Sequence, residues 1–141
     1  MKLIGIDYGE KYIGISYSIN GVIVEPYKVV EREKFTLEFS IIFEKIKPDK
    51  VIVGYPLLLS GDKGTMVHKV EKFAKEIKEK FKVEVIFFDE RFTTELAKRY
   101  LMKDFIKIRT RKKKKIDKKK LSLISAVIIL EDYLKFISKW F

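Results

Sequence analysis

The sequence has no cysteine and only one histidine among its 141 residues. Without cysteine, the chain can form neither a disulfide framework nor a thiolate metal site, and this fits a reducing compartment. The single histidine, His68, has no second histidine or cysteine with which to hold a metal, so we interpret it as a surface residue. Folds stapled by disulfides and metal centres built on cysteine are therefore excluded.

Long apolar runs and a disorder-type composition are also missing. The longest apolar stretch, residues 121–130, contains two serines and is much shorter than the ~20 residues of a membrane span. Residues 1–9 include an aspartate and no apolar signal core. Hydrophobic residues make up 47% of the chain, with only seven glycines and three prolines, so a packed core can form. We expect one globular domain, residues 1–141, in the cytoplasm.

Positive charge is in excess and is concentrated in one segment. The chain has 31 Lys and Arg against 20 Asp and Glu, a net charge of +11. Residues 103–120 hold eleven basic residues and two acids, so this segment contributes +9 and the rest of the chain +2. Such an excess favours a polyanionic partner, and we expect nucleic acid, with RNA favoured over DNA, rather than a membrane.

The core of this segment is the candidate phosphate-binding surface. Its basic residues would hold phosphates without reading bases, although a solvated surface loop would have the same composition. The candidate nucleic-acid-binding residues are Arg109, Arg111, Lys112, Lys113, Lys114 and Lys115.

The spacing of apolar residues predicts strands first and then alternating helices and strands. Residues 2–6, 12–18 and 22–24 are predicted to form an antiparallel meander, in which Asn20-Gly21 is the turn between the last two strands. Helical spacing then predicts helices over residues 35–46 and 66–81, the second with Thr65 as its N-cap. The remaining predicted elements are strands 50–53 and 83–88, a short helix at about 94–102 and a last helix at about 121–138.

This order predicts an α/β fold with a mixed five-stranded sheet. Strands added after the meander are expected to run parallel through right-handed crossovers, so that helices cover both faces of the sheet. The order of strands and helices is that of the ribonuclease-H-like fold.

Acidic side chains end two of the predicted strands. Asp7 ends the first strand, between Gly5 and Gly9, and the pair Asp89-Glu90 ends the strand at 83–88. Carboxylates that converge from neighbouring strand ends form a hard-oxygen site suited to Mg²⁺ or Mn²⁺. Two such ions would activate a water and stabilise the leaving oxygen of a phosphodiester. The alternatives are that Asp7 caps a turn and that Asp89-Glu90 are acids at a helix N-terminus.

Four successive motifs resemble those of the YqgF/RuvX family, the pre-16S rRNA nucleases that are also described as Holliday-junction-resolvase-like. The motifs are Gly5-Ile6-Asp7-Tyr8-Gly9 with Gly14-Ile15-Ser16, Val51-Ile52-Val53-Gly54-Tyr55-Pro56 with Gly61, Phe88-Asp89-Glu90-Arg91-Phe92-Thr93-Thr94 with Ala97, and Ala126-Val127-Ile128-Ile129-Leu130. The resemblance runs nearly end to end. It implies that Asp7 and Glu90 are catalytic acids that bind the metal.

The sequence departs from the family pattern at one position. By resemblance, a third carboxylate is expected at the start of the last helix, where this chain has Ser122. The nearest acid is Asp117, five residues upstream. Three readings remain open: Asp117 takes over as a catalytic acid, Ser122 holds only a water, or the third ligand is missing.

The function expected from these features is metal-dependent hydrolysis of phosphodiester bonds in structured RNA. The family resemblance implies a role in maturation of the 5′ end of pre-16S rRNA. The alternatives are a Holliday junction resolvase acting on DNA, and a nucleic-acid-binding factor that has lost its third carboxylate and with it cleavage. An actin-like kinase, which the Gly-x-Asp-x-Gly hairpin would also suit, needs two such domains and does not fit 141 residues.

Overall fold

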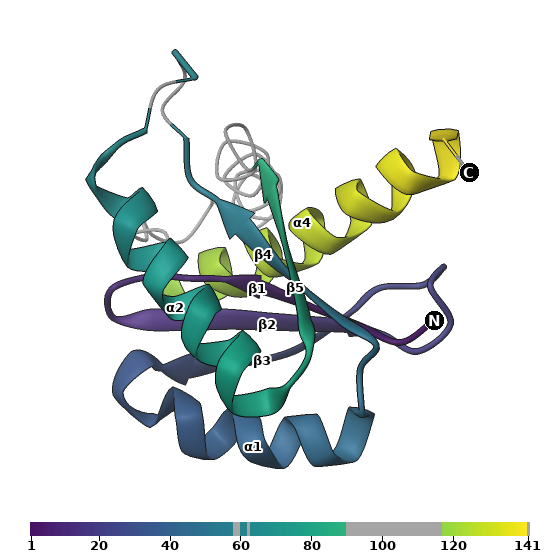
Figure 1. The fold of residues 1–141 in the computed structure, drawn as a ribbon, viewed down its shortest axis with the longest axis horizontal. Coiled ribbons are helices and arrows are strands. Elements are labelled where there is room, and N and C mark those ends of the chain that lie inside the picture. Colours follow the sequence, from purple (N-terminus) through teal and green to yellow (C-terminus); the bar gives the residue numbers. More distant parts are fainter. Residues whose placement is uncertain (58–59, 62, 90–116, 141) are drawn as a thin grey trace, which may run out of the picture.

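The computed structural model describes residues 1–57, 60–61, 63–89 and 117–140. It contains a five-stranded sheet in the order β3-β2-β1-β4-β5 (Figure 1). The strands are β1 (Leu3–Asp7), β2 (Tyr12–Ser18), β3 (Glu25–Glu31), β4 (Lys50–Tyr55) and β5 (Glu84–Asp89). The helices are η1 (Arg32–Lys34), α1 (Phe35–Ile46), α2 (Thr65–Phe81) and α4 (Lys118–Trp140).

The sheet is mixed, as the sequence predicted. Strands β1, β2 and β3 pair antiparallel, whereas β4 pairs parallel to β1, and β5 parallel to β4. Helices α1 and α2 lie on one face of the sheet, and α4 crosses the other face (Figure 1). The carboxyl ends of β1, β4 and β5 therefore lie along the same edge.

Two apolar clusters fill the space on either side of the sheet. Side chains alternate along β1, so Ile4 and Ile6 pack with α1 and α2, while Leu3 packs with Ile129 and Leu130 of α4. All five of these side chains are fully buried. This alternation determines which side chains at the end of β1 face α4.

The third strand was predicted wrongly. It spans Glu25–Glu31, and residues 22–24 belong to the loop before it, where Val22 and Ile23 are exposed. The Asn20 side-chain oxygen accepts hydrogen bonds from the backbone N–H groups of Val22 and Ile23, both at 2.9 Å, and Gly21 adopts a φ of 74°. Asn20 and Gly21 thus build an Asx-type turn inside a longer loop rather than a two-residue hairpin.

Two helix starts also differ from the prediction. Gly64 is the N-cap residue of α2, without a side-chain cap, and Thr65 is already helical. Helix α4 begins at Lys118, three residues earlier than predicted. The predicted helix at about 94–102 lies outside the described residues. Within the described part of the chain, no helix is both long enough and apolar enough to cross a membrane.

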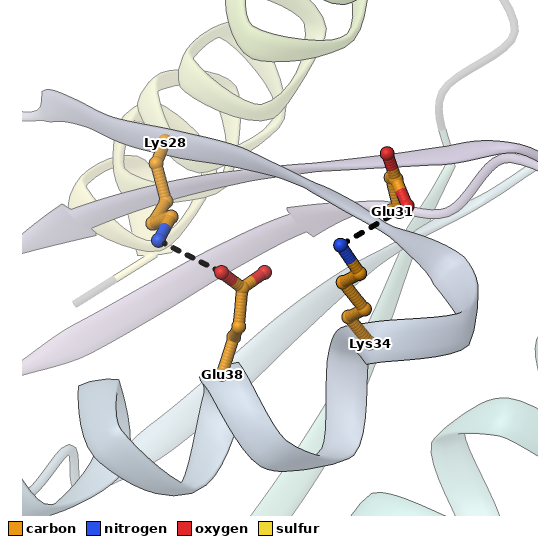
Figure 2. A network of polar contacts seen from close by, with 4 residues as sticks. All are labelled: Lys28, Glu31, Lys34 and Glu38. Carbon is orange, nitrogen blue, oxygen red and sulfur yellow. Dashed lines mark hydrogen bonds and ion pairs between the residues drawn. The ribbon is translucent and has the colours of Figure 1, made fainter.

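Ion pairs join η1 and α1 to the edge strand β3 (Figure 2). Lys28 of β3 lies 3.2 Å from Glu38 of α1, and Glu31 lies 3.7 Å from Lys34 of η1. Exposed pairs of this kind contribute only about 0–1 kcal/mol each. The stability of α1 comes mainly from its buried side, where Phe35, Phe39 and Ile42 pack into the core.

Candidate active site

Asp7 is the last residue of β1 and is half-buried. Its antiparallel partner on β2 is Gly14, and a side chain at Gly14 would point against α4. Paired residues of antiparallel strands share a face, so Asp7 lies on the face that α4 covers. The next residue, Tyr8, packs on the opposite face with Phe73 of α2, at 4.7 Å between ring centroids.

Helix α4 approaches the end of β1 closely because β1 and β2 carry small residues beneath it. A Cβ atom at Gly14 would lie 2.0 Å from the backbone oxygen of Ser122. A Cβ atom at Gly5 would lie 2.9 Å from the Leu130 Cβ and 3.1 Å from the Ala126 oxygen. Buried Ser16 donates a hydrogen bond from Oγ to the Ala126 carbonyl at 2.7 Å. The absence of a side chain at Gly5 thus lets α4 approach β1.

The position of the expected third acid lies at this same end of the sheet. The Ser122 carbonyl touches Gly14, and Gly14 is the residue paired with Asp7. The last helix therefore brings position 122 beside the Asp7 end of β1, as the family resemblance implied. This position holds a serine instead of a carboxylate.

Asp117 caps helix α4. Its Oδ1 accepts a hydrogen bond from the Lys119 backbone N–H at 2.9 Å, and its carbonyl accepts the first helical hydrogen bond, from Leu121, at 3.0 Å. An aspartate at this position satisfies N–H groups that no helical carbonyl can reach. Its catalytic role stays a prediction.

Strand β5 ends at Asp89, the residue before Glu90, at the same edge of the sheet. Tyr55 of β4 pairs with Asp89, and Gly54 pairs with Phe88. Since Ile6 pairs with Val53, the next residue of β4, Gly54, stands beside Asp7 and places no side chain between Asp7 and β5. Glu90 and the six basic residues from Arg109 to Lys115 lie outside the described residues.

The comparisons with known proteins identify the family. The family described as "RuvX: Holliday junction resolvase" matches residues 1–136. The chain belongs to the RuvX family. The resemblance carried by the four sequence motifs is thereby confirmed.

Two relatives are similar to this RuvX-family chain over nearly their whole length. A protein of Caldanaerobacter subterraneus subsp. tengcongensis named "Putative pre-16S rRNA nuclease" is 35% identical, over 95% of this chain and 96% of the relative. A protein of Dictyoglomus turgidum with the same name is 33% identical, over 98% of this chain and 96% of the relative.

Solved resolvases share the fold of this RuvX-family chain. Thermus thermophilus RuvC superposes with a TM-score of 0.59 at 12% identity, over 99% of this chain and 97% of RuvC. A yeast mitochondrial Holliday junction resolvase superposes with a TM-score of 0.53 at 14% identity, over 99% of this chain and 84% of the resolvase. The ribonuclease-H-like fold class predicted from the sequence is therefore confirmed.

The turn that follows Asp7 is held by contacts that the sequence analysis missed. Arg32 donates a hydrogen bond from Nε to the Glu10 carbonyl at 2.7 Å and from its backbone N–H to the Lys11 carbonyl at 3.0 Å. Lys69 of α2 lies 2.5 Å from the Glu10 carboxylate. This hydrogen bond and the charge of Lys69 lower the pKa of Glu10, and Arg32 contributes in the same direction. Pairings between distant segments of this kind leave no sequence pattern.

Basic side chains also lie beside the Asp7 edge on the α4 side. The Lys119 Nζ is 5.2 Å from the ring centroid of Tyr12, and the Lys11 Nζ is 5.4 Å from the same centroid. Lys118, Lys119 and Lys120 are all exposed in the first turn of α4. Part of the basic segment found in the sequence therefore lies next to the candidate site.

The donor chemistry at this edge suits a hard divalent cation. Asp7 offers carboxylate oxygens at a strand end. Within the described ranges, no cluster of three His, Cys, Asp or Glu side chains forms a metal site. Glu90, the other metal-binding acid that the sequence predicts, lies outside those ranges.

Proposed function

We propose that this protein is a metal-dependent nuclease that hydrolyses phosphodiester bonds of structured RNA, in maturation of the 5′ end of pre-16S rRNA. The observation that carries the proposal is the position of Asp7, at the carboxyl end of β1 and under the first turns of α4, in a chain of the RuvX family. The similar relatives that are named as pre-16S rRNA nucleases support this choice of substrate.

Asp7 and Glu90 would hold Mg²⁺ or Mn²⁺ in this proposal. Bound there, the metal would supply Lewis-acid activation of a water and charge stabilisation for the leaving oxygen. The chain's own part is to orient the carboxylates. Gly5 and Gly14 let α4 press against β1 and β2, and Arg32 and Lys69 hold the turn that follows Asp7.

The lysines near the site would bind the substrate backbone. Lys118, Lys119 and Lys120 project from the first turn of α4, where the helix N-terminus adds partial positive charge. Phosphate groups would be attracted to this end of the helix whatever the base sequence. The proposed role of the basic residues from Arg109 to Lys115 is to extend the same surface.

A direct test compares matched RNA and DNA substrates. The full chain is incubated with Mg²⁺ or Mn²⁺ and either a precursor RNA containing the 5′ leader of 16S rRNA or a four-way DNA junction, and the products are resolved by length. Cleavage of the RNA near the mature 5′ end, dependent on the metal, is the expected result. Cleavage of the junction alone would favour a DNA resolvase, the function named for the yeast protein that shares the fold. No cleavage of either would favour a binding factor.

The third acid gives a separate prediction. We propose that Asp117 supplies the third carboxylate through the oxygen that does not cap Lys119. Asparagine is as good an N-cap as aspartate, so Asp117→Asn should keep α4 intact and still abolish cleavage. Ser122→Asp should then change the rate little. A large gain from Ser122→Asp, together with full activity in Asp117→Asn, would show instead that the third ligand is missing.

The basic segment is predicted to supply most of the affinity for nucleic acid. Replacing Lys112, Lys113, Lys114 and Lys115 with alanine removes four charges. If all four contact phosphates of a single strand, the slope of log affinity against log salt should fall by about 2.8. The measurement is a binding titration at several salt concentrations, with Lys45, Lys47, Lys80 and Lys82 replaced as a matched control. An unchanged slope would mean that these lysines are only solvated.

A further inference from the structure

A cleft opens on the other side of the Asp7 edge, between α2 and the start of α1. It has a volume of about 450 Å³, within the range of small-ligand sites. Tyr8 lines it from the turn after β1, Arg32 from η1, and Lys69 and Lys72 from α2. The proposed metal site does not use the side chains of Tyr8 and Lys72.

The lining combines aromatic walls with a basic rim. Phe35 and Phe73 are buried in the cleft wall, with ring centroids 4.8 Å apart, and half-buried Tyr8 packs against Phe73. The rim carries Arg32 and Lys72, both exposed. Aromatic faces beside basic groups are what proteins use to hold nucleotides of a single strand.

The charge balance of the cleft leaves positive groups for a ligand. Three basic residues and two acids, Glu10 and Glu76, line it. Lys69 is paired with Glu10 at 2.5 Å, so these two charges offset each other. In the described part of the chain, Lys72 and Arg32 form no ion pair with any acid, Glu76 included. The cleft is therefore suited to a phosphate group at its rim.

Adjacent side chains connect this cleft with the candidate active site. Asp7 and Tyr8 are consecutive residues whose side chains lie on opposite faces of the sheet, Asp7 toward α4 and Tyr8 toward α2. A nucleic-acid strand that passes over this edge of the sheet would contact Asp7 and Tyr8 within a short length. A base-paired duplex would have to bring both bases of each pair into the cleft together, so we expect the cleft to take an unpaired base.

We propose that the cleft between α1 and α2 holds an unpaired nucleotide of the substrate strand, next to the phosphate positioned at Asp7. This inference rests on the proposed nuclease function, which places the cleaved phosphate at Asp7. It adds that the substrate must be unpaired on one side of the cleavage point. Lys72 would contact the phosphate, and the exposed part of Tyr8 would stack on the base.

The test is a binding titration without divalent metal, so that no cleavage interferes. The probes are a short fluorescein-labelled single-stranded RNA, the same sequence as single-stranded DNA, and the corresponding blunt RNA duplex, followed by fluorescence anisotropy. Lys72→Ala should weaken binding of the single strands about fivefold and lower the salt slope by about 0.7. Lys75→Ala, on the exposed side of α2 away from the cleft, is the matched control and should have no effect. Duplex binding should be the same in both variants.

A second variant tests the stacking without removing charge. Tyr8→Leu keeps an apolar group against Phe73 and should weaken single-strand binding about tenfold, as expected for the loss of one base–aromatic contact. Equal affinities for Lys72→Ala and Lys75→Ala, or no binding of single strands by the unmodified protein, would overturn the proposal. Neither result would contradict metal-dependent cleavage at Asp7. If the unmodified protein did not cleave RNA but Lys72→Ala still weakened single-strand binding, only the nuclease proposal would be overturned.

Discussion

Replacing Asp7 with asparagine is expected to reduce the cleavage rate by roughly 10³-fold. The amide has the size of the carboxylate but carries no negative charge, so it holds a divalent cation poorly. A bound metal supplies several kcal/mol of transition-state stabilisation, and each 1.36 kcal/mol corresponds to a factor of ten in rate. The measurement is single-turnover cleavage of the precursor RNA at saturating Mg²⁺, for the unmodified protein and the variant.

The control for this variant is a measurement of its thermal stability. Asp7 is half-buried at the end of a strand, whereas the core of β1 lies in Leu3, Ile4 and Ile6. Asp7→Asn should therefore keep the thermal unfolding midpoint within a few degrees of the unmodified protein. Full activity in a well-folded Asp7→Asn protein would remove the proposed mechanism, while loss of the fold would require Asp7→Ser as a second variant with the same expected inactivity.

Replacing Gly14 with alanine is expected to destabilise the protein by about 3 kcal/mol, the upper end for overpacking a tightly packed site. The added Cβ atom would lie 2.0 Å from the Ser122 carbonyl oxygen and 2.5 Å from its carbon. These are backbone atoms of α4, so they cannot rotate away as a side chain would, and the helix must shift. Denaturant unfolding followed by circular dichroism measures the loss.

The same substitution should also slow cleavage, because α4 covers the face on which Asp7 lies. Ser122→Ala is the matched control: it changes the side chain at the contact and keeps the carbonyl, so its stability should change by well under 1 kcal/mol. An unfolding midpoint for Gly14→Ala equal to that of the control would contradict the close packing of α4 on β2.

Most of the fold follows from local patterns in the sequence. The apolar spacing of residues 35–46 predicts α1 with the bounds that the structure shows, because one helical face must be buried. The alternation in β2 and the apolar runs of β1 and β4 predict the strands for the same reason. The loop before β3 was misjudged because an Asx turn and a two-residue hairpin start from the same Asn-Gly pair.

The sequence by itself also determined the family and the acidic residue that ends β1 in the candidate site. An acid at the end of an apolar strand is visible in the chain, and the four motifs identify the family to which it belongs. What only the tertiary structure decided is which segments meet at Asp7. Gly14 and Ser122 are far apart in the sequence, yet the absence of a side chain at Gly14 lets the backbone of Ser122 contact it.

The cleft beside Tyr8 likewise exists only in three dimensions. Its lining comes from the turn after β1, from η1, from the start of α1 and from α2, and no period or motif links these segments. Local sequence patterns reflect burial within one helix or strand, whereas a site depends on how several elements pack around the same sheet edge. That packing depends on how all the core side chains fit together. Only the folded chain therefore places Arg32, Lys69 and Lys72 around the turn that follows Asp7.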